Sequence, residues 1–376
     1  GQMSPERDIH REYMKQRSIL EQPSGTEGLR LRDAWNHKTL VKNLSTTLEL
    51  WGYLPVNTPV LDYYDAYSPL LADGHTNGMY RLIDRDGDLL AVRSDATLFL
   101  AKQVARMLAD EELPLRVYYA ESILRPEDRE DISRNEFFQI GGELIGKTGR
   151  SGDLEAATLL MRLLDSTLPG RSVLHIGNRK LVNTLTAGFS DSAATEFREA
   201  LALHDSERLK GLLQGSSGDA HGILRFLFHI GSARETNAAL AELESGAASL
   251  SEDFFTAARD TIETAEALET MFDGERIRID FSESGSQSYH TGIAFRAYAP
   301  GAEAAVASGG RYDSLYGNFG LETEAVGFSI MLRRLEKLTD PDPVPDIQTI
   351  ADDGSSFSER LAKADQLRRQ GTAVRL

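Results

Sequence analysis

The stretch RVYYAESILRPEDREDISRNEFFQIGGELIG, residues 116–146, decides the fold of this chain. Its two ends, Arg116–Arg125 and Glu136–Ile145, are rich in β-branched and aromatic residues, whereas the residues between them are polar and charged. This pattern predicts two strands joined by a long charged loop. Side chains an even number of positions apart on a strand project from the same face. We therefore expect Gln139 and Glu143 to share one face of the second strand.

Two charged residues stand where the first strand enters the loop. If the strand continues, Arg125 and Glu127 project on one face, because they are two positions apart. A guanidinium group in such a place can bind a phosphate or a carboxylate through two parallel hydrogen bonds. The alternative is an exposed ion pair of small energetic value, with Gln139 an ordinary hydrogen-bonded polar residue.

The sequence LRPE, a loop and then NEFFQIGGELIG resembles motif 2 of class II aminoacyl-tRNA synthetases, specifically of the histidyl type. The resemblance implies an α+β fold, in which helices flank an antiparallel sheet. It also implies that Arg125 and Glu127 match the pair that orients ATP, and that Gln139 and Glu143 match two positions of the histidine pocket. The second loop arginine of that family falls on Asn135 here.

The segment RSDAT precedes the apolar run LFLAKQVARML, which we expect to form a helix capped by Asp95 or Ser94. Before it, Met79–Asp84 and Leu89–Arg93 flank RDGD, a strong hairpin signal. The synthetases carry RPEGT at this place, and its acid and threonine hold the α-amino group of histidine. The resemblance therefore assigns that role to Asp95 and Thr97, while capping alone is the other interpretation of Asp95.

Apolar residues at three-four spacing predict a helix over Asp33–Leu50, and VNTPVL predicts a strand over Val56–Leu61 that carries Pro59. This arrangement resembles motif 1, which builds the dimer interface of the family. The resemblance thus implies a homodimer. The alternative is an ordinary edge strand, where a proline is tolerated.

The segment SYHTG stands where histidyl synthetases carry RGLDYYTG. Tyr289 matches the family, His290 replaces a tyrosine, and the signature arginine falls on Gly285. The resemblance places Tyr289 and His290 in the histidine pocket, beside the imidazole.

The stretch AVGFSIMLRRLEKL resembles motif 3, with the final arginine of the family at Arg334. The family has glycine and glutamate where this chain has Met331 and Arg333. Glycine serves where a ligand must approach the backbone closely, and a methionine side chain fills that space. Arg125, Glu127 and Arg334 are therefore predicted to form a vestigial nucleotide side.

Composition shifts, together with the resemblance to the synthetases, predict four parts of the chain. Residues 1–177 form the first part of the synthetase-like core, residues 178–272 a helical insertion, and residues 273–339 the second part of the core with motif 3. Residues 340–376 follow as a proline-rich linker and a βαβ remnant of an anticodon-binding-like domain.

Bulk composition excludes several classes of site. The chain has no cysteine, which rules out disulfides and thiolate metal sites, and its histidines are too scattered to suggest a metal site. We expect no cofactor. A formal charge of −17 disfavours broad contact with a phosphate backbone, so tRNA binding is not expected. Without an apolar run of membrane-spanning length or a signal-peptide core, the expected location is the cytoplasm.

Three functions compete. An active histidyl-tRNA synthetase needs positioned cations, and each lost donor costs about 2.7–4 kcal/mol of barrier. A synthetase-like ligase would need the same groups. The losses at Asn135, Gly285 and Met331 instead favour the synthetase paralogues that serve as regulatory subunits of ATP phosphoribosyltransferase, the first enzyme of histidine biosynthesis. These do no chemistry, activate a short catalytic subunit within a hetero-octamer, and are needed for feedback inhibition by histidine.

The retained residues Asp95, Thr97, Gln139, Glu143 and Tyr289 suggest that the former amino-acid pocket became a histidine sensor. A ligand transmits a signal only if it binds two states of the protein unequally. The alternative hypothesis places histidine at the subunit interface and leaves this pocket without a ligand.

Overall fold

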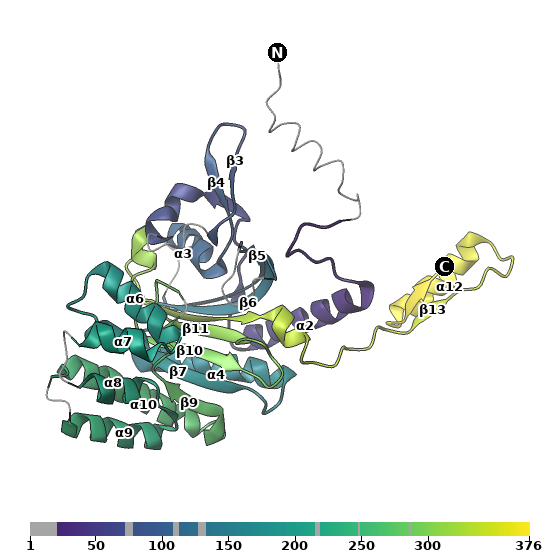
Figure 1. Cartoon of the computed structure of the whole chain (residues 1–376). Coiled ribbons are helices and arrows are strands. Elements are labelled where there is room, and N and C mark those ends of the chain that lie inside the picture. Colours follow the sequence, from purple (N-terminus) through teal and green to yellow (C-terminus); the bar gives the residue numbers. More distant parts are fainter. Residues whose placement is uncertain are drawn as a thin grey trace, which may run out of the picture.

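A nine-stranded, mostly antiparallel sheet runs through the centre of the chain (Figure 1). The computed structural model describes residues 21–71, 78–107, 113–126, 133–214, 219–246, 249–285 and 287–376. The strands of this sheet, in spatial order, are β1 (Leu54–Pro55), β5 (Leu115–Leu124), β6 (Glu136–Ile145), β12 (Ala325–Met331), β11 (Ala307–Arg311), β10 (Ile293–Tyr298), β7 (Val173–Asn178), β9 (Ile277–Asp280) and β8 (Ile230–Gly231).

The predicted pair of strands in the 116–146 stretch is confirmed. Strands β5 and β6 pair antiparallel along their whole lengths, from Leu115 opposite Ile145 to Leu124 opposite Glu136. Side chains of β6 alternate between the two faces of the sheet, since Ile140 and Leu144 join the main hydrophobic core while Phe137 and Ile145 join a smaller one. Gln139 and Glu143 therefore lie on the face of the smaller core, as the spacing predicted.

Helices cover both faces of the sheet. Figure 1 shows α3 beside β5 and above β6, and α4 packs against β6 and β12. The main core packs α2, α4 and the later helices against one face, and the smaller core packs α3 against the other. The helices are α2 (Leu31–Leu50), α3 (Ala96–Met107), α4 (Gly149–Thr167), α5 (Arg179–Leu185), α6 (Asp191–Ala202), α7 (Ser206–Leu213), α8 (Ala220–Leu227), α9 (Ala233–Gly246), α10 (Glu252–Glu269), α11 (Leu332–Glu336) and α12 (Phe357–Arg369).

The predicted strand over Val56–Leu61 is wrong. Of the predicted range, only Leu61 lies in a strand, as the first residue of β2. Strand β1 ends before the range, at Pro55, and the backbone between the two strands is irregular. At Thr58 the backbone N–H donates to Glu121 Oε1 at 2.6 Å, and the carbonyl accepts from Arg93 Nη1 at 2.8 Å. Side chains have thus replaced the ladder hydrogen bonds at Thr58, whereas Val56 and Val60 each keep one backbone hydrogen bond, to Tyr118 and Arg93. Pro59 additionally has no N–H to contribute.

A small sheet and a terminal unit stand apart from the large sheet. The predicted hairpin is confirmed as β3 and β4, which Figure 1 shows projecting from the top of the molecule beside α3. Near the C-terminus, a parallel strand pair and α12 form the expected βαβ unit at the end of an extended segment (Figure 1). The small sheet consists of β2 (Leu61–Tyr63), β4 (Leu89–Val92) and β3 (Arg81–Ile83), and the terminal pair of β13 (Ile347–Thr349) and β14 (Ala373–Arg375).

The segment between β7 and β9 is helical, as its pattern predicted, with one addition. Helices α5 to α10 occupy it, but β8 also pairs antiparallel with β9 and becomes the edge strand of the large sheet. The segment is therefore joined to the sheet by backbone hydrogen bonds as well as by its two chain connections.

Candidate amino-acid pocket

A row of small residues crosses the sheet on the face of the smaller core. In register from strand to strand, Glu143 lies opposite Gly327, Gly327 opposite Gly310, Gly310 opposite Ala294, and Ala294 opposite Gly177. A Cβ atom added at Gly327 would lie 1.8 Å from Oε2 of Glu143. The glycines therefore make room for side chains that lie flat over the sheet, and Glu143 is the first of these.

Glu143 is the electrostatic centre of this face. Its side chain is 1% exposed, and Oε1 accepts a 2.6 Å hydrogen bond from Oγ1 of Thr97 on α3. Burial raises the pKa of Glu143 well above its usual range, against the opposing effect of the Thr97 hydrogen bond. Its other oxygen, Oε2, is buried and has no hydrogen-bond partner among the described residues. A buried acceptor of this kind is costly unless a ligand or water completes it.

Asp95 has both of the roles considered for it. Its Oδ1 accepts from the backbone N–H of Leu98 at 3.1 Å, so it caps α3 as predicted. Its Oδ2 accepts from the hydroxyl of Tyr289 at 2.9 Å and lies 3.9 Å from Nη2 of Arg125. Arg125 also donates through Nε to the carbonyl of Ser94 at 2.7 Å. Asp95 therefore joins the helix start, the strand end and the SYHTG segment.

Two tyrosines that the sequence interpretation did not assign pack beside Tyr289. Tyr312 and Tyr316 are both buried, and neither hydroxyl has a hydrogen-bond partner in the part of the chain that the structure describes. The ring of Tyr312 lies 5.5 Å from that of Tyr289 and 6.3 Å from that of Tyr316. The charge of Glu143 contributes to raising the pKa of Tyr316, after burial, which places the two groups in one environment. The signal was present in SGGRYDSLYG, where two tyrosines follow a glycine-rich strand.

The sequence predicts that His290 contacts a histidine ligand, but the hydrogen bond of its ring stays within its own segment. Its ring packs over Gly310, and its Nδ1 accepts a 3.3 Å hydrogen bond from the backbone N–H of Gln287. Burial, with the nearby charge of Arg179, lowers the pKa of His290 to about 3, so the imidazole is neutral. Among the described residues it makes no hydrogen bond to Asp95 or Glu143. Its geometry is that of a wall residue that supports Tyr289.

Gln139 lies near the start of β6, whereas Glu143 lies near its end. Its side chain is 3% exposed, and its Nε2 lies 3.6 Å from Sδ of Met331, which pairs with it across the sheet. Met331, Phe137 and Arg334 line a surface pocket between the start of β6 and α11. Arg334 also donates to the carbonyl of Ala305 at 2.7 Å. This pocket is on the predicted nucleotide side, where the Met331 side chain takes up space. Glu127 lies outside the described residues.

The described segment before α2, residues 21–30, is called the N-terminal arm here and reaches the surface pocket beside Met331. Glu27 accepts from Arg134 at 2.9 Å and from Arg333 at 2.9 Å, and both arginines line the pocket. The Arg333 and Arg134 hydrogen bonds lower the pKa of Glu27. Asn135 holds the arm in place, since its backbone N–H donates to the carbonyl of Gly25 at 2.9 Å. The position where the family has a loop arginine therefore anchors the arm instead.

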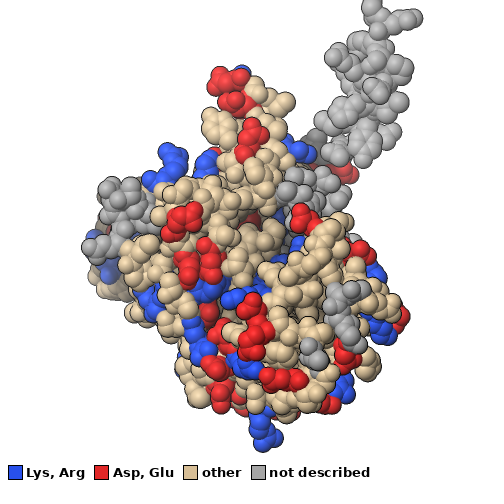
Figure 2. Space-filling model, turned by 90° about the vertical axis from the view of Figure 1, so that its left-hand side faces the viewer, with Lys and Arg blue, Asp and Glu red and all other residues tan. Residues whose placement is uncertain are grey.

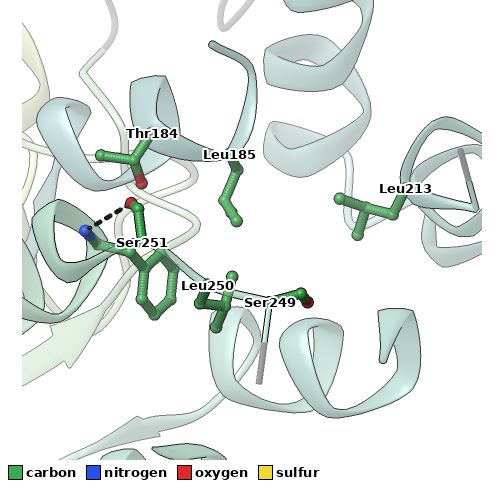
Figure 3. A pocket seen from close by; sticks show the side chains of 7 residues that line it. Thr184, Leu185, Leu213, Ser249, Leu250 and Ser251 are labelled. Carbon is green, nitrogen blue, oxygen red and sulfur yellow. Dashed lines mark hydrogen bonds between the residues drawn. The ribbon is translucent and has the colours of Figure 1, made fainter. Parts of the chain in front are cut away.

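A second hollow lies among the helices α5, α7 and α10 (Figure 3). Leucine and phenylalanine side chains line it together with hydroxyl groups, and Ser251 uses its hydroxyl to cap α10 through the N–H of Phe254 at 3.3 Å. None of its lining residues is charged. It offers nothing to hold an ammonium or carboxylate group, so the amino-acid pocket is the stronger candidate.

Surface charge on the molecule is mixed in sign. On the face shown in Figure 2, acidic and basic side chains are interspersed, without a continuous basic area. Among the described residues, no group of three or more histidine, aspartate or glutamate side chains is arranged to hold a metal ion. No helix in the described part of the chain combines the length and apolar character needed to cross a membrane.

The chain was compared with known proteins. The family model for histidyl-tRNA synthetase matches residues 25–335. The ATP phosphoribosyltransferase regulatory subunit of Moorella thermoacetica is 31% identical over 368 residues, which cover 94% of this chain and 91% of that protein. The protein of the same name from Symbiobacterium thermophilum is 31% identical over 332 residues, covering 83% and 78%.

Solved structures give the same result for the fold. A protein described as an ATP phosphoribosyltransferase regulatory subunit/histidyl-tRNA synthetase from Bacillus halodurans matches with a TM-score of 0.81 and 25% identity, over 96% of this chain and 93% of that one. A histidyl-tRNA synthetase from a Nostoc species matches with a TM-score of 0.76 and 22% identity, over 96% and 86%, and supports the fold alone. Sequence and structure agree that this chain belongs to the family of ATP phosphoribosyltransferase regulatory subunits, which has the fold of histidyl-tRNA synthetases.

Proposed function

We propose that this chain associates with the short catalytic subunit of ATP phosphoribosyltransferase, activates it, and makes it sensitive to histidine without catalysing a reaction itself. The observation that carries this proposal is the buried Glu143, whose Oε1 accepts from the Thr97 hydroxyl while its Oε2 lies over Gly327 and has no partner among the described residues. A carboxyl group in this state is suited to a ligand that brings its own polar hydrogen.

Histidine fits the pocket group by group. Its α-ammonium would bind Asp95 and Thr97, at the start of α3. Its imidazole would lie against Glu143, with Tyr312 and Tyr316 as further hydrogen-bond partners. Gln139, four residues before Glu143 on the same face of β6, is the candidate for the carboxylate of the ligand.

The nucleotide side supports a role without adenylation. Adenylate formation develops negative charge on a phosphoryl group and needs cations aimed at it. Here Glu27 already binds two of the arginines that line that side, Arg134 and Arg333. Met331 occupies the position that the synthetases leave to glycine. We infer that Arg125 and Arg334 are remnants of the nucleotide site and that the chain transfers no adenylate.

Assembly is the second part of the proposal. Exposed apolar side chains occur at the end of α2 and along the segment from β1 to β2, which corresponds to the motif 1 region. We propose that this surface forms a homodimer, and that the dimer combines with the catalytic subunit in a hetero-octamer. The exposed side chains are those of Leu50, Trp51, Leu54, Val60, Leu61 and Tyr63.

The test uses the purified chain with a short-form catalytic subunit. We expect turnover of that subunit to rise when the chain is added and to fall again with added histidine. The Glu143→Ala chain should still activate, but should no longer confer inhibition by histidine. If inhibition were unchanged, histidine would act elsewhere, such as at the subunit interface, and the pocket hypothesis would be rejected. Pyrophosphate exchange with histidine and ATP should be absent.

A further inference from the structure

One buried arginine holds the segment that supplies Tyr289 to the pocket. Arg179, the first residue of α5, donates through Nε to the carbonyl of Ser284 at 2.5 Å. Its Nη2 donates to the carbonyls of Gly285 and Gln287, each at 3.0 Å. Its backbone N–H donates to the carbonyl of Gly292 at 2.8 Å. Four carbonyls, on both sides of Tyr289 in the sequence, therefore accept hydrogen bonds from this single residue.

The hydrogen bonds of Arg179 are strong because its guanidinium group is buried and charged. Arg179 is 7% exposed, and burial lowers its pKa to about 10, so it remains a cation at neutral pH. Hydrogen bonds from a charged donor are roughly twice as strong as neutral ones. The rigid, planar fork of a guanidinium reaches several fixed carbonyls at once, which the single ammonium of lysine cannot do.

The conformation of the segment depends on the glycine at position 285. Gly285 has a φ of +92°, in the region that favours glycine, and a Cβ atom there would lie 2.7 Å from Nδ1 of His290. The place at which the synthetase signature carries its arginine therefore has no space for one here. The cation that holds this segment comes instead from the start of α5.

We propose that Arg179 is the positioning residue of the amino-acid pocket, and that through it the α5 helix senses whether the pocket is occupied. The proposal rests on the proposed function, in which the pocket binds histidine. The chain of contacts is continuous, since Arg179 fixes the segment, the segment aims the Tyr289 hydroxyl at Oδ2 of Asp95, and Asp95 holds the start of α3. Histidine bound beside α3 and Glu143 would thus change the contacts that Arg179 makes at the start of α5.

Histidine affinity, measured by calorimetry on the full-length chain, tests this role. We expect R179M to raise the Kd for histidine about tenfold, which is ~1.4 kcal/mol, and R179K to raise it about threefold. The matched control is R276K. Arg276 also binds a backbone carbonyl, that of Ser172 at 2.9 Å, and an acid, but it lies just before β9 and touches none of the groups above. Its Kd should stay within about twofold of the unchanged chain.

A double-mutant cycle separates positioning from general destabilisation. Y289F should weaken histidine binding, and adding R179K to it should weaken binding no further, because both changes break the same contact chain. Fully additive effects, or equal losses in R179K and R276K, would overturn the proposal. If R179M does not fold, R179K and the cycle with Y289F give the same decision.

The Glu143→Gln variant separates the proposal that the pocket binds histidine from the proposal that Arg179 positions Tyr289. If Glu143→Gln abolishes histidine binding while R179K and R179M leave the Kd unchanged, the pocket stands and the role of Arg179 is rejected. If the unchanged chain binds no histidine, the proposed function fails, and Arg179 loses its assigned role with it.

Discussion

Oγ1 of Thr97 donates a 2.6 Å hydrogen bond to Oε1 of Glu143, although 46 residues separate the two in the sequence. The bond joins the first turn of α3 to the middle of the sheet and fixes the position of a carboxyl group that is 1% exposed. It leaves Oε2 without a partner among the described residues. It places a buried carboxyl group with one unpartnered oxygen beside α3, and the proposed amino-acid pocket depends on that group.

Glu143→Gln is expected to stabilise the fold and to remove histidine binding. The pKa of Glu143 is raised by burial, so its ionised form is costly in the folded protein, and a neutral amide of the same shape avoids that cost. We expect the midpoint of thermal unfolding to rise by a few degrees, as ~1 kcal/mol would give in a chain of this size. Calorimetric titration should show no heat of histidine binding. A lower midpoint together with unchanged binding would contradict both expectations.

His290 should make the chain less stable in acid. Its pKa is about 3 in the folded chain, against about 6.5 unfolded, so the unfolded state binds a proton that the folded state does not. The contribution of His290 is fully present above about pH 6.5 and is lost as the pH falls toward about 3, at up to ~1.4 kcal/mol per pH unit. Urea unfolding at pH 7, 6 and 5 should show a flatter profile for His290→Gln. His221→Gln, an exposed position on α8, should keep the original slope.

Asp153 should have the opposite effect. Burial raises its pKa to about 6, beyond what its 2.7 Å ion pair with Arg311 offsets. The folded state therefore binds the proton more tightly, and the stability contribution, full below about pH 3.8, is lost as the pH rises through about 6. Relative to Asp153→Asn, the unfolding free energy should fall by about 2 kcal/mol between pH 4 and pH 7. A difference that grew with pH would show that the ion pair outweighs burial.

Restoring the missing glycine should not restore adenylation. Met331→Gly removes the side chain that lines the nucleotide side and that contacts Gln139 at 3.6 Å. The signature arginine is still absent, because Gly285 has no room for it. Histidine-dependent pyrophosphate exchange should therefore remain undetectable in this variant, with a histidyl-tRNA synthetase as the positive control. Exchange in Met331→Gly alone would show that the methionine was the main obstacle.

The arm contributes little to folding but fixes the local charge balance. Glu27 is half exposed, so replacing it with glutamine should cost less than ~1 kcal/mol of stability, as for other exposed ion pairs. The variant should bind inorganic pyrophosphate more tightly than the unchanged chain, because Arg134 and Arg333 lose their shared carboxylate. Fluorescence or calorimetric titration at low salt checks this, and the difference should shrink as salt is added. Asp365→Asn, on α12, is the control.

The sequence determined the features that depend on near neighbours along the chain. A two-residue period specified β5 and β6 and placed Gln139 and Glu143 on one face, and the cap at Asp95 followed from its position before an apolar helix. Motif spacing also located the residues shared with the synthetases. The expected strand over Val56–Leu61 failed because two distant side chains satisfied the backbone of Thr58.

Only the tertiary structure decided which of these residues meet and what else joins them. Tyr312, Tyr316, Arg179 and Glu27 each reach their sites from elements far away in the sequence, and nothing in the local pattern marks a tyrosine as unsatisfied or an arginine as buried. Periodicity reports which way a side chain points from its own strand or helix. Burial, pairing and the cost of an unsatisfied oxygen depend on the groups that packing brings from elsewhere, so they exist only once the sheet and helices are assembled.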